Sequence, residues 1–95
     1  MGFLDKILRK KLFDPDERRR SLLAHGRITD GVIIENETDP YGNAVAVFAY
    51  TLNGVDFESS DILTEEQRLV SIKYAPGAKV GIRYDPRNQG NSILE

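Results

Sequence analysis

The stretch 74–86 constrains the fold more than any other part of the chain, because it joins a tight turn to a strictly alternating strand. Pro76 sets φ for the second position of a β-turn, and Gly77 can adopt the positive φ that a type II turn requires next. The alternating apolar positions that follow are Val80, Ile82 and Tyr84. This period is that of a strand with one buried face, and Asp85-Pro86 ends it.

A second strong signal is the dipeptide Asn53-Gly54, which favours a two-residue hairpin turn. The strand before it is predicted at residues 44–52, and its partner starts directly after the turn. The turn fixes the register, which pairs Leu52 with Val55, Tyr50 with Phe57 and Phe48 with Ser59, and on the other face Thr51 with Asp56 and Ala49 with Glu58. We expect Phe48, Tyr50, Leu52, Val55 and Phe57 to face the core and the second set to be solvated.

The remaining strands are signalled less sharply. Ile28, Val32 and Ile34 share a parity that predicts one buried face, with a bulge near Gly31. Residues 35–43 are predicted to form a loop. A capping box from Thr64 to Gln67 predicts a helical turn at 65–70, and the alternative is a loop that leads into a strand at 71–74. Near the end of the chain we expect a turn at 87–91 and a last short strand at 92–94.

Helical patterns precede the strands. In residues 3–13 the apolar side chains recur every three to four positions, which predicts a short amphipathic helix. A second helix is predicted from Asp14 as N-cap, with Pro15 at its first position, to His25, with Gly26 as the residue that stops it. We therefore divide the chain into a basic amphipathic helical leader, residues 1–26, and a β-barrel domain, residues 27–95.

These elements predict a mainly β (α+β) protein. Several short strands joined by glycine-rich turns favour a small antiparallel β-barrel or rolled sheet of about five strands, preceded by one or two N-terminal helices. Closing the sheet would hide its edges. The predicted core consists of Ile28, Val32, Ile34, Phe48, Tyr50, Leu52, Val55, Phe57, Val80, Ile82 and Tyr84.

The chain resembles the family known as domain of unknown function 3592 over residues 26–94. The elements that carry the resemblance are Gly31-x-Ile33, residues 44–52 with Gly54 and Phe57, the run Tyr74-x-x-Gly77-x-x-Val80-x-Ile82-x-Tyr84-Asp85-Pro86-x-Asn88, and Ser92-x-Leu94. The resemblance implies a small β-domain, often flanked by membrane-spanning helices in other members, with no attached activity. This chain departs from the pattern at Gln89, where a second proline is usual, and it lacks an apolar run long enough to span a bilayer.

Composition argues against most catalytic and metal chemistry. The chain has no cysteine and a single histidine, His25, so neither a thiolate site nor a His-based relay has the residues it needs. Asp56, Glu58 and Asp61 could hold a hard cation, but an acidic solvent face explains them better. We therefore expect no enzyme activity, no catalytic residues, no metal site and no cofactor.

Charge divides the chain into two parts. Residues 1–30 carry eight basic and five acidic side chains, a net charge of +3, and the remainder carries five basic and ten acidic ones, a net charge of −5. An acidic body whose aromatics face inward disfavours nucleic-acid binding. The sequence instead predicts a protein-interaction or scaffold module with an unidentified protein partner or self-association.

The alternative is a membrane-surface adaptor that binds anionic lipid through the amphipathic leader. The predicted contact residues, for a partner or a membrane, are Phe3, Leu4, Ile7, Leu8, Lys10, Lys11 and Leu12. The same apolar stripe could instead pack on the barrel or pair with another copy. The expected location is the cytoplasm, with peripheral attachment to the inner membrane surface under the alternative.

Overall fold

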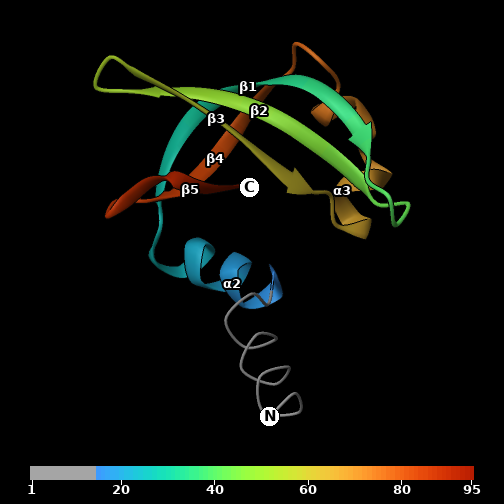
Figure 1. Ribbon diagram of the computed structural model, residues 1–95, viewed down its shortest axis with the longest axis horizontal. Coiled ribbons are helices and arrows are strands. Elements are labelled where there is room, and N and C mark those ends of the chain that lie inside the picture. The colour runs from blue at the N-terminus through green and yellow to red at the C-terminus, as the bar shows by residue number, and fades with distance from the viewer. Residues whose placement is uncertain (1–14) are drawn as a thin grey trace.

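The computed structural model describes residues 15–95, in which one helix precedes five strands (Figure 1). Two short helical segments lie between the third and fourth strands. In chain order the elements are α2 (Pro15–His25), β1 (Arg27–Thr38), β2 (Ala44–Leu52), β3 (Val55–Ile62), α3 (Glu65–Leu69), the 3-10 helix η1 (Ser71–Tyr74), β4 (Lys79–Asp85) and β5 (Asn88–Leu94). The described part of the chain is therefore mostly β.

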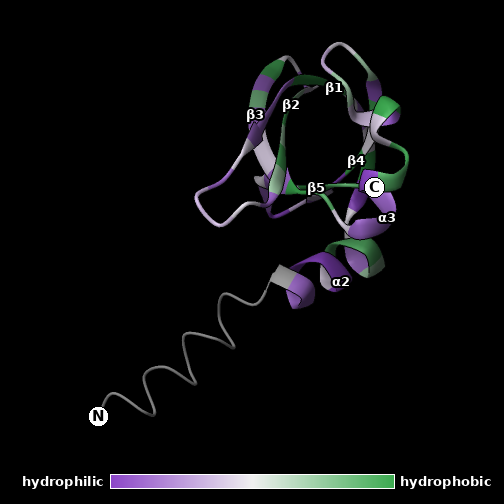
Figure 2. Ribbon diagram, turned by 90° about the vertical axis from the view of Figure 1, so that its right-hand side faces the viewer, coloured by the Kyte–Doolittle hydropathy of each residue, from purple (hydrophilic) through white to green (hydrophobic). Residues whose placement is uncertain are grey.

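The five strands form one antiparallel sheet in the order β3-β2-β1-β4-β5. The sheet curls until its two edges, β3 and β5, contact each other, which makes a nearly closed barrel. Figure 2 shows the strands arranged around a common centre, with α2 outside the ring on the side of β5. The predicted fold class is confirmed.

The β2–β3 hairpin has the predicted register. Asn53 and Gly54 have φ values of 52° and 82°, the two positive angles of a type I′ turn. All five predicted pairs are present: Leu52 with Val55, Tyr50 with Phe57, Phe48 with Ser59, Thr51 with Asp56 and Ala49 with Glu58. The turn alone was sufficient to fix this part of the sheet.

Two other local predictions are confirmed. Gly77 has φ 88°, and Ala78 N–H donates to the Ala75 carbonyl over 2.9 Å, which closes the predicted turn around Pro76. Thr64 and Gln67 form a reciprocal capping box at the start of α3. Residues 71–74 form η1, so the alternative strand there is wrong. The predicted turn at 87–91 is also shorter than expected, because β5 already begins at Asn88.

The barrel interior is filled by side chains from four strands. Ile33, Phe48, Ile82 and Leu94 are each at most 1% exposed. Tyr50 stacks on three neighbouring rings, with ring centroids 6.1 Å from Phe48, 5.4 Å from Phe57 and 6.5 Å from Tyr84. Offset stacking of this kind adds to the hydrophobic gain of burying the rings.

The predicted buried face of β1 is wrong. Ile28, Val32 and Ile34 are 59%, 39% and 44% exposed, whereas Ile33 is 1% exposed. The reason is Gly31, which lies opposite Tyr50 on the inner face, where a Cβ atom would come within 2.2 Å of Ile82 Cδ1. The register irregularity of β1 falls between Ile33 and Glu35 rather than at Gly31.

The predicted core is otherwise correct except at the end of the hairpin. Val55 is 55% exposed because it directly follows the turn. Phe57, Val80 and Tyr84 are partly buried and pack against the core cluster. Leu63 and Tyr74 also belong to that cluster and were absent from the predicted set.

Helix α2 begins at Pro15 and ends at His25, as predicted, whereas its predicted N-cap lies outside the described residues. Leu22 is 6% exposed, and the helix packs against β4 and β5. Gly26 follows the helix and donates its N–H to the Leu22 carbonyl over 2.8 Å. A Cβ at Gly26 would lie 2.4 Å from that same oxygen, so close packing explains this glycine.

Candidate functional site

The predicted contact residues of the leader, Phe3, Leu4, Ile7, Leu8, Lys10, Lys11 and Leu12, lie outside the residues that the structure describes. Candidate sites within residues 15–95 must therefore be found from their contacts. Three features stand out: a polar seam between β3 and β5, a groove rimmed by glutamates, and an exposed apolar patch after α3.

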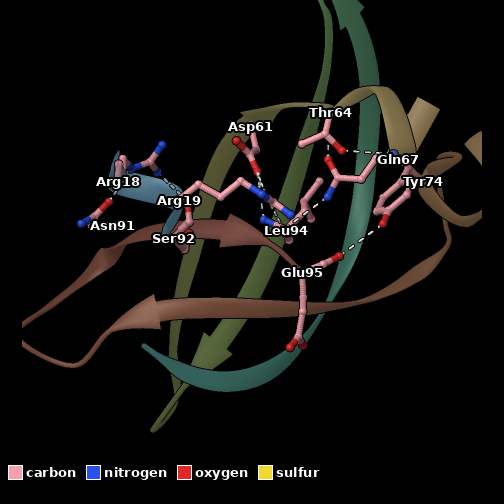
Figure 3. Close-up of polar contacts among 10 residues, drawn as sticks. All are labelled: Arg18, Arg19, Asp61, Thr64, Gln67, Tyr74, Asn91, Ser92, Leu94 and Glu95. Atoms are coloured by element: carbon pink, nitrogen blue, oxygen red, sulfur yellow. Dashed lines mark hydrogen bonds and ion pairs between the residues drawn. The ribbon is translucent and has the colours of Figure 1, made fainter. Parts of the chain in front are cut away.

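The first feature is the seam where the two barrel edges meet (Figure 3). Asp61 of β3 accepts the Leu94 N–H of β5 over 3.1 Å. Arg19 of α2 donates to the Leu94 carbonyl over 2.8 Å and lies 3.6 Å from the Asp61 carboxylate. Beside it, Arg18 donates to Asn91 Oδ1 over 2.8 Å and to the Ser92 carbonyl over 2.5 Å.

The seam continues into α3 and η1. Gln67, which caps α3, is 5% exposed and also donates to the Leu94 carbonyl over 3.4 Å. Tyr74 of η1 donates to the Glu95 carbonyl over 3.2 Å. Helix α2, β3, α3 and η1 thus all converge on the last residues of β5, as Figure 3 shows.

The pKa of Asp61 in the seam is raised by burial. Its side chain is 12% exposed, and burial raises its pKa above 3.8, while the Leu94 N–H and the charges of Arg19 and Arg18 act in the opposite direction. The carboxylate is occupied by these contacts, which join structural elements. We therefore assign the seam a structural role.

The three carboxylates that were considered as a cation site and interpreted as an acidic solvent face do not come together. Asp56 and Glu58 lie on the outer face of β3, where Asp56 accepts the Thr51 hydroxyl over 2.6 Å. Asp61 has the opposite parity, pairs with the buried Ala46 and faces the seam. Among residues 15–95 no three side chains of the metal-binding types come together.

The second feature, here called the acidic groove, lies over the outer face of β1–β3. It has a volume of about 440 Å³. Its lining residues are Glu35, Glu37, Val45, Val47, Glu58, Ser59 and Ser60. Glu35 raises the pKa of Glu37, chiefly through a hydrogen bond and then through its charge.

The third feature, here called the apolar patch, comprises Leu69, Val70 and Ile72. Their exposed fractions are 86%, 43% and 84%. Leaving a large aliphatic side chain in water forgoes about 1.5–3 kcal/mol relative to full burial. The patch is therefore a candidate contact surface. Sequence reasoning missed it because residues 65–74 offered no decisive periodicity.

A further hollow of about 690 Å³ separates α2 from the β4–β5 turn. Arg18, His25, Asp85 and Arg87 are among its lining residues. Asp85 accepts the Arg87 N–H over 2.8 Å, so part of this polar lining holds the turn itself. His25 is exposed at the end of α2.

The fold defines a small antiparallel β-barrel domain with an α-helix packed outside it. The family model for a domain of unknown function, DUF3592, matches residues 24–95, so the chain belongs to this family. No curated protein and no solved structure matches the chain. None of the helices that the structure describes is long and apolar enough to cross a membrane.

Proposed function

We propose that this protein is a non-enzymatic protein-interaction module, in which the barrel is a rigid scaffold and recognition occurs on its outer surface. The observation that carries the proposal is the apolar patch, where Leu69 and Ile72 are both more than four-fifths exposed. The barrel interior supports it, because Phe48, Ile82 and Leu94 fill that space. A ligand would have to displace the core to enter.

The partner that fits the patch is a second copy of the chain. A two-fold interface would bring Leu69 and Ile72 of each copy against the same residues of the other, which is the usual arrangement of homodimers. Burying these side chains would recover the free energy that their exposure costs. The charged groups nearby, Glu65, Glu66 and Arg68, would form a polar rim.

Size-exclusion chromatography with light scattering over a range of concentrations tests this proposal. We expect the mass to rise from the monomer value of 10.7 kDa towards twice that value, and the double variant Leu69→Ser/Ile72→Ser to stay monomeric. The matched control is Ile28→Ser/Val55→Ser, which removes two equally apolar but separate exposed side chains and should leave association unchanged. A wild-type protein that remains monomeric at every concentration contradicts the proposal.

The alternative, a membrane-surface adaptor, is favoured by the basic amphipathic pattern of residues 3–13 next to an acidic body. Under this proposal Lys10→Glu/Lys11→Glu abolishes pelleting with vesicles of phosphatidylglycerol and phosphatidylcholine. Arg27→Glu/Lys79→Glu applies the same charge change to the barrel and serves as the control. Equal pelleting of all three proteins removes the adaptor function.

A further inference from the structure

The acidic groove combines an apolar floor with a rim of one charge. Val45 and Val47 form the apolar part, and Val47 is 8% exposed although it lies on the opposite side of β2 from the buried Phe48. Glu35, Glu37 and Glu58 provide the rim, and none of the lysines or arginines among residues 15–95 lines the groove. Such a surface matches a segment that is apolar on one side and basic on the other.

The groove is continuous with the start of the described chain. A neighbouring hollow of about 430 Å³ shares Val45 and Ser60 with it. The other residues of that hollow include Ile62, Thr64 and Asp16. Asp16 is the second described residue, so the described chain begins beside this neighbouring hollow, which adjoins the groove and is also lined by Arg18 and Arg19.

Residues 3–13 have the composition that the groove requires. Their large apolar side chains are Phe3, Leu4, Ile7, Leu8, Leu12 and Phe13. Their four basic side chains, Lys6, Arg9, Lys10 and Lys11, stand against one acidic residue, Asp5. The net charge of +3 over this segment is opposite to that of the three rim glutamates.

The lengths also agree. A helix of residues 3–13 would be about 16 Å long, and the β3 strand from Ile62 to Glu58 rises about 13 Å along the floor. Pro15 disfavours the helical conformation at Asp14, so the chain can change direction between the predicted helix and α2. Residues 3–13 therefore have the length needed to lie along β3 of the same chain.

From this continuity, charge match and length we propose that residues 3–13 dock in the acidic groove of their own chain. The apolar stripe packs over Val45 and Val47, and the basic side chains face Glu35, Glu37 and Glu58. The inference is independent of self-association through the apolar patch. It adds a consequence for the membrane alternative, because a docked segment withholds its apolar side chains from lipid.

Paramagnetic relaxation in the full chain tests the docking. The protein has no cysteine, so Gly2→Cys provides a unique position for a nitroxide label. We expect loss of amide signals at residues 45–47 and 58–60, and full intensity at residues 85–88 in the β4–β5 turn. Undiminished signals along the groove, or a loss confined to residues 69–72, would overturn the proposal.

A mixed sample identifies the molecule that supplies the segment. Isotope-labelled protein without nitroxide is combined with nitroxide-labelled protein of natural isotopic abundance. Docking within one chain leaves the signals of this mixture intact. Signal loss at residues 45–47 in the mixture means that a second copy occupies the groove, and it overturns the assignment to the same chain.

Charge reversal tests the rim. Glu35→Lys/Glu37→Lys should abolish most of the signal loss at residues 45–47, and the exposed control Asp30→Lys/Glu66→Lys should preserve it. The amide chemical shifts of the barrel core residues, compared with those of wild type, show whether each variant is folded. A folded rim variant that keeps the full effect contradicts the role of the glutamates.

Discussion

Between β1 and β4 the barrel is held by backbone pairing, in a ladder that runs from Arg27 with Tyr84 to Val32 with Lys79. Between β3 and β5, where the sheet edges meet, the closure depends on side chains instead. Asp61 accepts one N–H of β5, and Arg19 reaches from α2 to the carbonyl of the same residue, Leu94. One side is a continuous sheet, and the other is a seam.

This difference shows how a small barrel can protect its edges without a complete ring of strand pairing. An unpaired edge strand is a template for aggregation unless something covers it. Here the cover is α2, whose arginines donate to the carbonyls of Ser92 and Leu94 on the edge strand β5. Arg18 and Arg19 precede residue 24, where the family match begins, so this part of the closure lies outside the matched residues.

Removing a core side chain beside the β1–β4 ladder should have the largest effect. Ile82 is 0% exposed and pairs with Thr29, so Ile82→Ala should lower the free energy of unfolding by about 3 kcal/mol. Urea denaturation measures the change. Ile28→Ala lies in the same ladder but is 59% exposed, and it should cost less than about 0.5 kcal/mol. If both variants lost the same free energy of unfolding, this would contradict the finding that Ile28 on β1 faces solvent.

Adding a methyl group on the inner face of that ladder comes next. Gly31→Ala would place Cβ 2.6 Å from the Ala49 carbonyl oxygen and even closer to Ile82, which should cost about 2 kcal/mol. The control is Gly81→Ala, whose Cβ would meet only the flexible end and Cβ of Glu95 at 3.0 Å or more. Thermal and urea unfolding should both separate the two variants, and a neutral Gly31→Ala would refute the close packing.

Disrupting the seam between β3 and β5 should lower the free energy of unfolding less than the substitutions in the β1–β4 ladder do. Arg19→Ala removes the donor to Leu94 and the charge beside Asp61, and should lower the free energy of unfolding by about 1–2 kcal/mol. Arg20→Ala, on the exposed side of the same helix, is the matched control and should be nearly neutral. Amide exchange adds a local measurement: the Leu94 N–H should exchange faster in Arg19→Ala only. Unchanged exchange would mean that α2 does not secure the edge.

The smallest effect concerns pH. Because burial raises the pKa of Asp61, the folded state holds this proton more tightly than the unfolded state does. Its stabilising contribution is therefore greatest below 3.8 and is lost as pH rises through the folded pKa. Unfolding of wild type and Asp61→Asn across this acidic range should show wild type losing stability relative to the variant as pH increases. A difference that grows in favour of wild type would show that the charges of Arg19 and Arg18 dominate.

The sequence predicted the β2–β3 hairpin in full but predicted the wrong face of β1, for a physical reason. Asn53-Gly54 fixes a turn whose geometry dictates every pair behind it. In β1 three consecutive apolar residues, Val32, Ile33 and Ile34, leave the alternation ambiguous, and the inner position before them is a glycine. Only the structure shows that Ile82 and the Ala49 carbonyl leave no room for a Cβ at this inward position, which lies opposite Tyr50.

The candidate sites were less accessible to sequence reasoning than the fold. The seam joins Arg19, Asp61, Gln67 and Leu94, which lie far apart along the chain and carry no shared motif. The capping box at Thr64 was visible, but the second role of Gln67 was not. The glutamates of the acidic groove were seen only as net charge, because their arrangement depends on the curl of the sheet.

The β1–β4 ladder also has a kinetic consequence. Its partners come from opposite ends of the barrel sequence, whereas β2 with β3 and β4 with β5 are joined by short turns. Pairing strands that are distant in sequence requires closing a long loop, and the chain entropy is lost before any stabilising contact forms. This slows folding. We therefore expect the two hairpins to form first, and the rate-limiting step to be the docking of one half of the barrel onto the other.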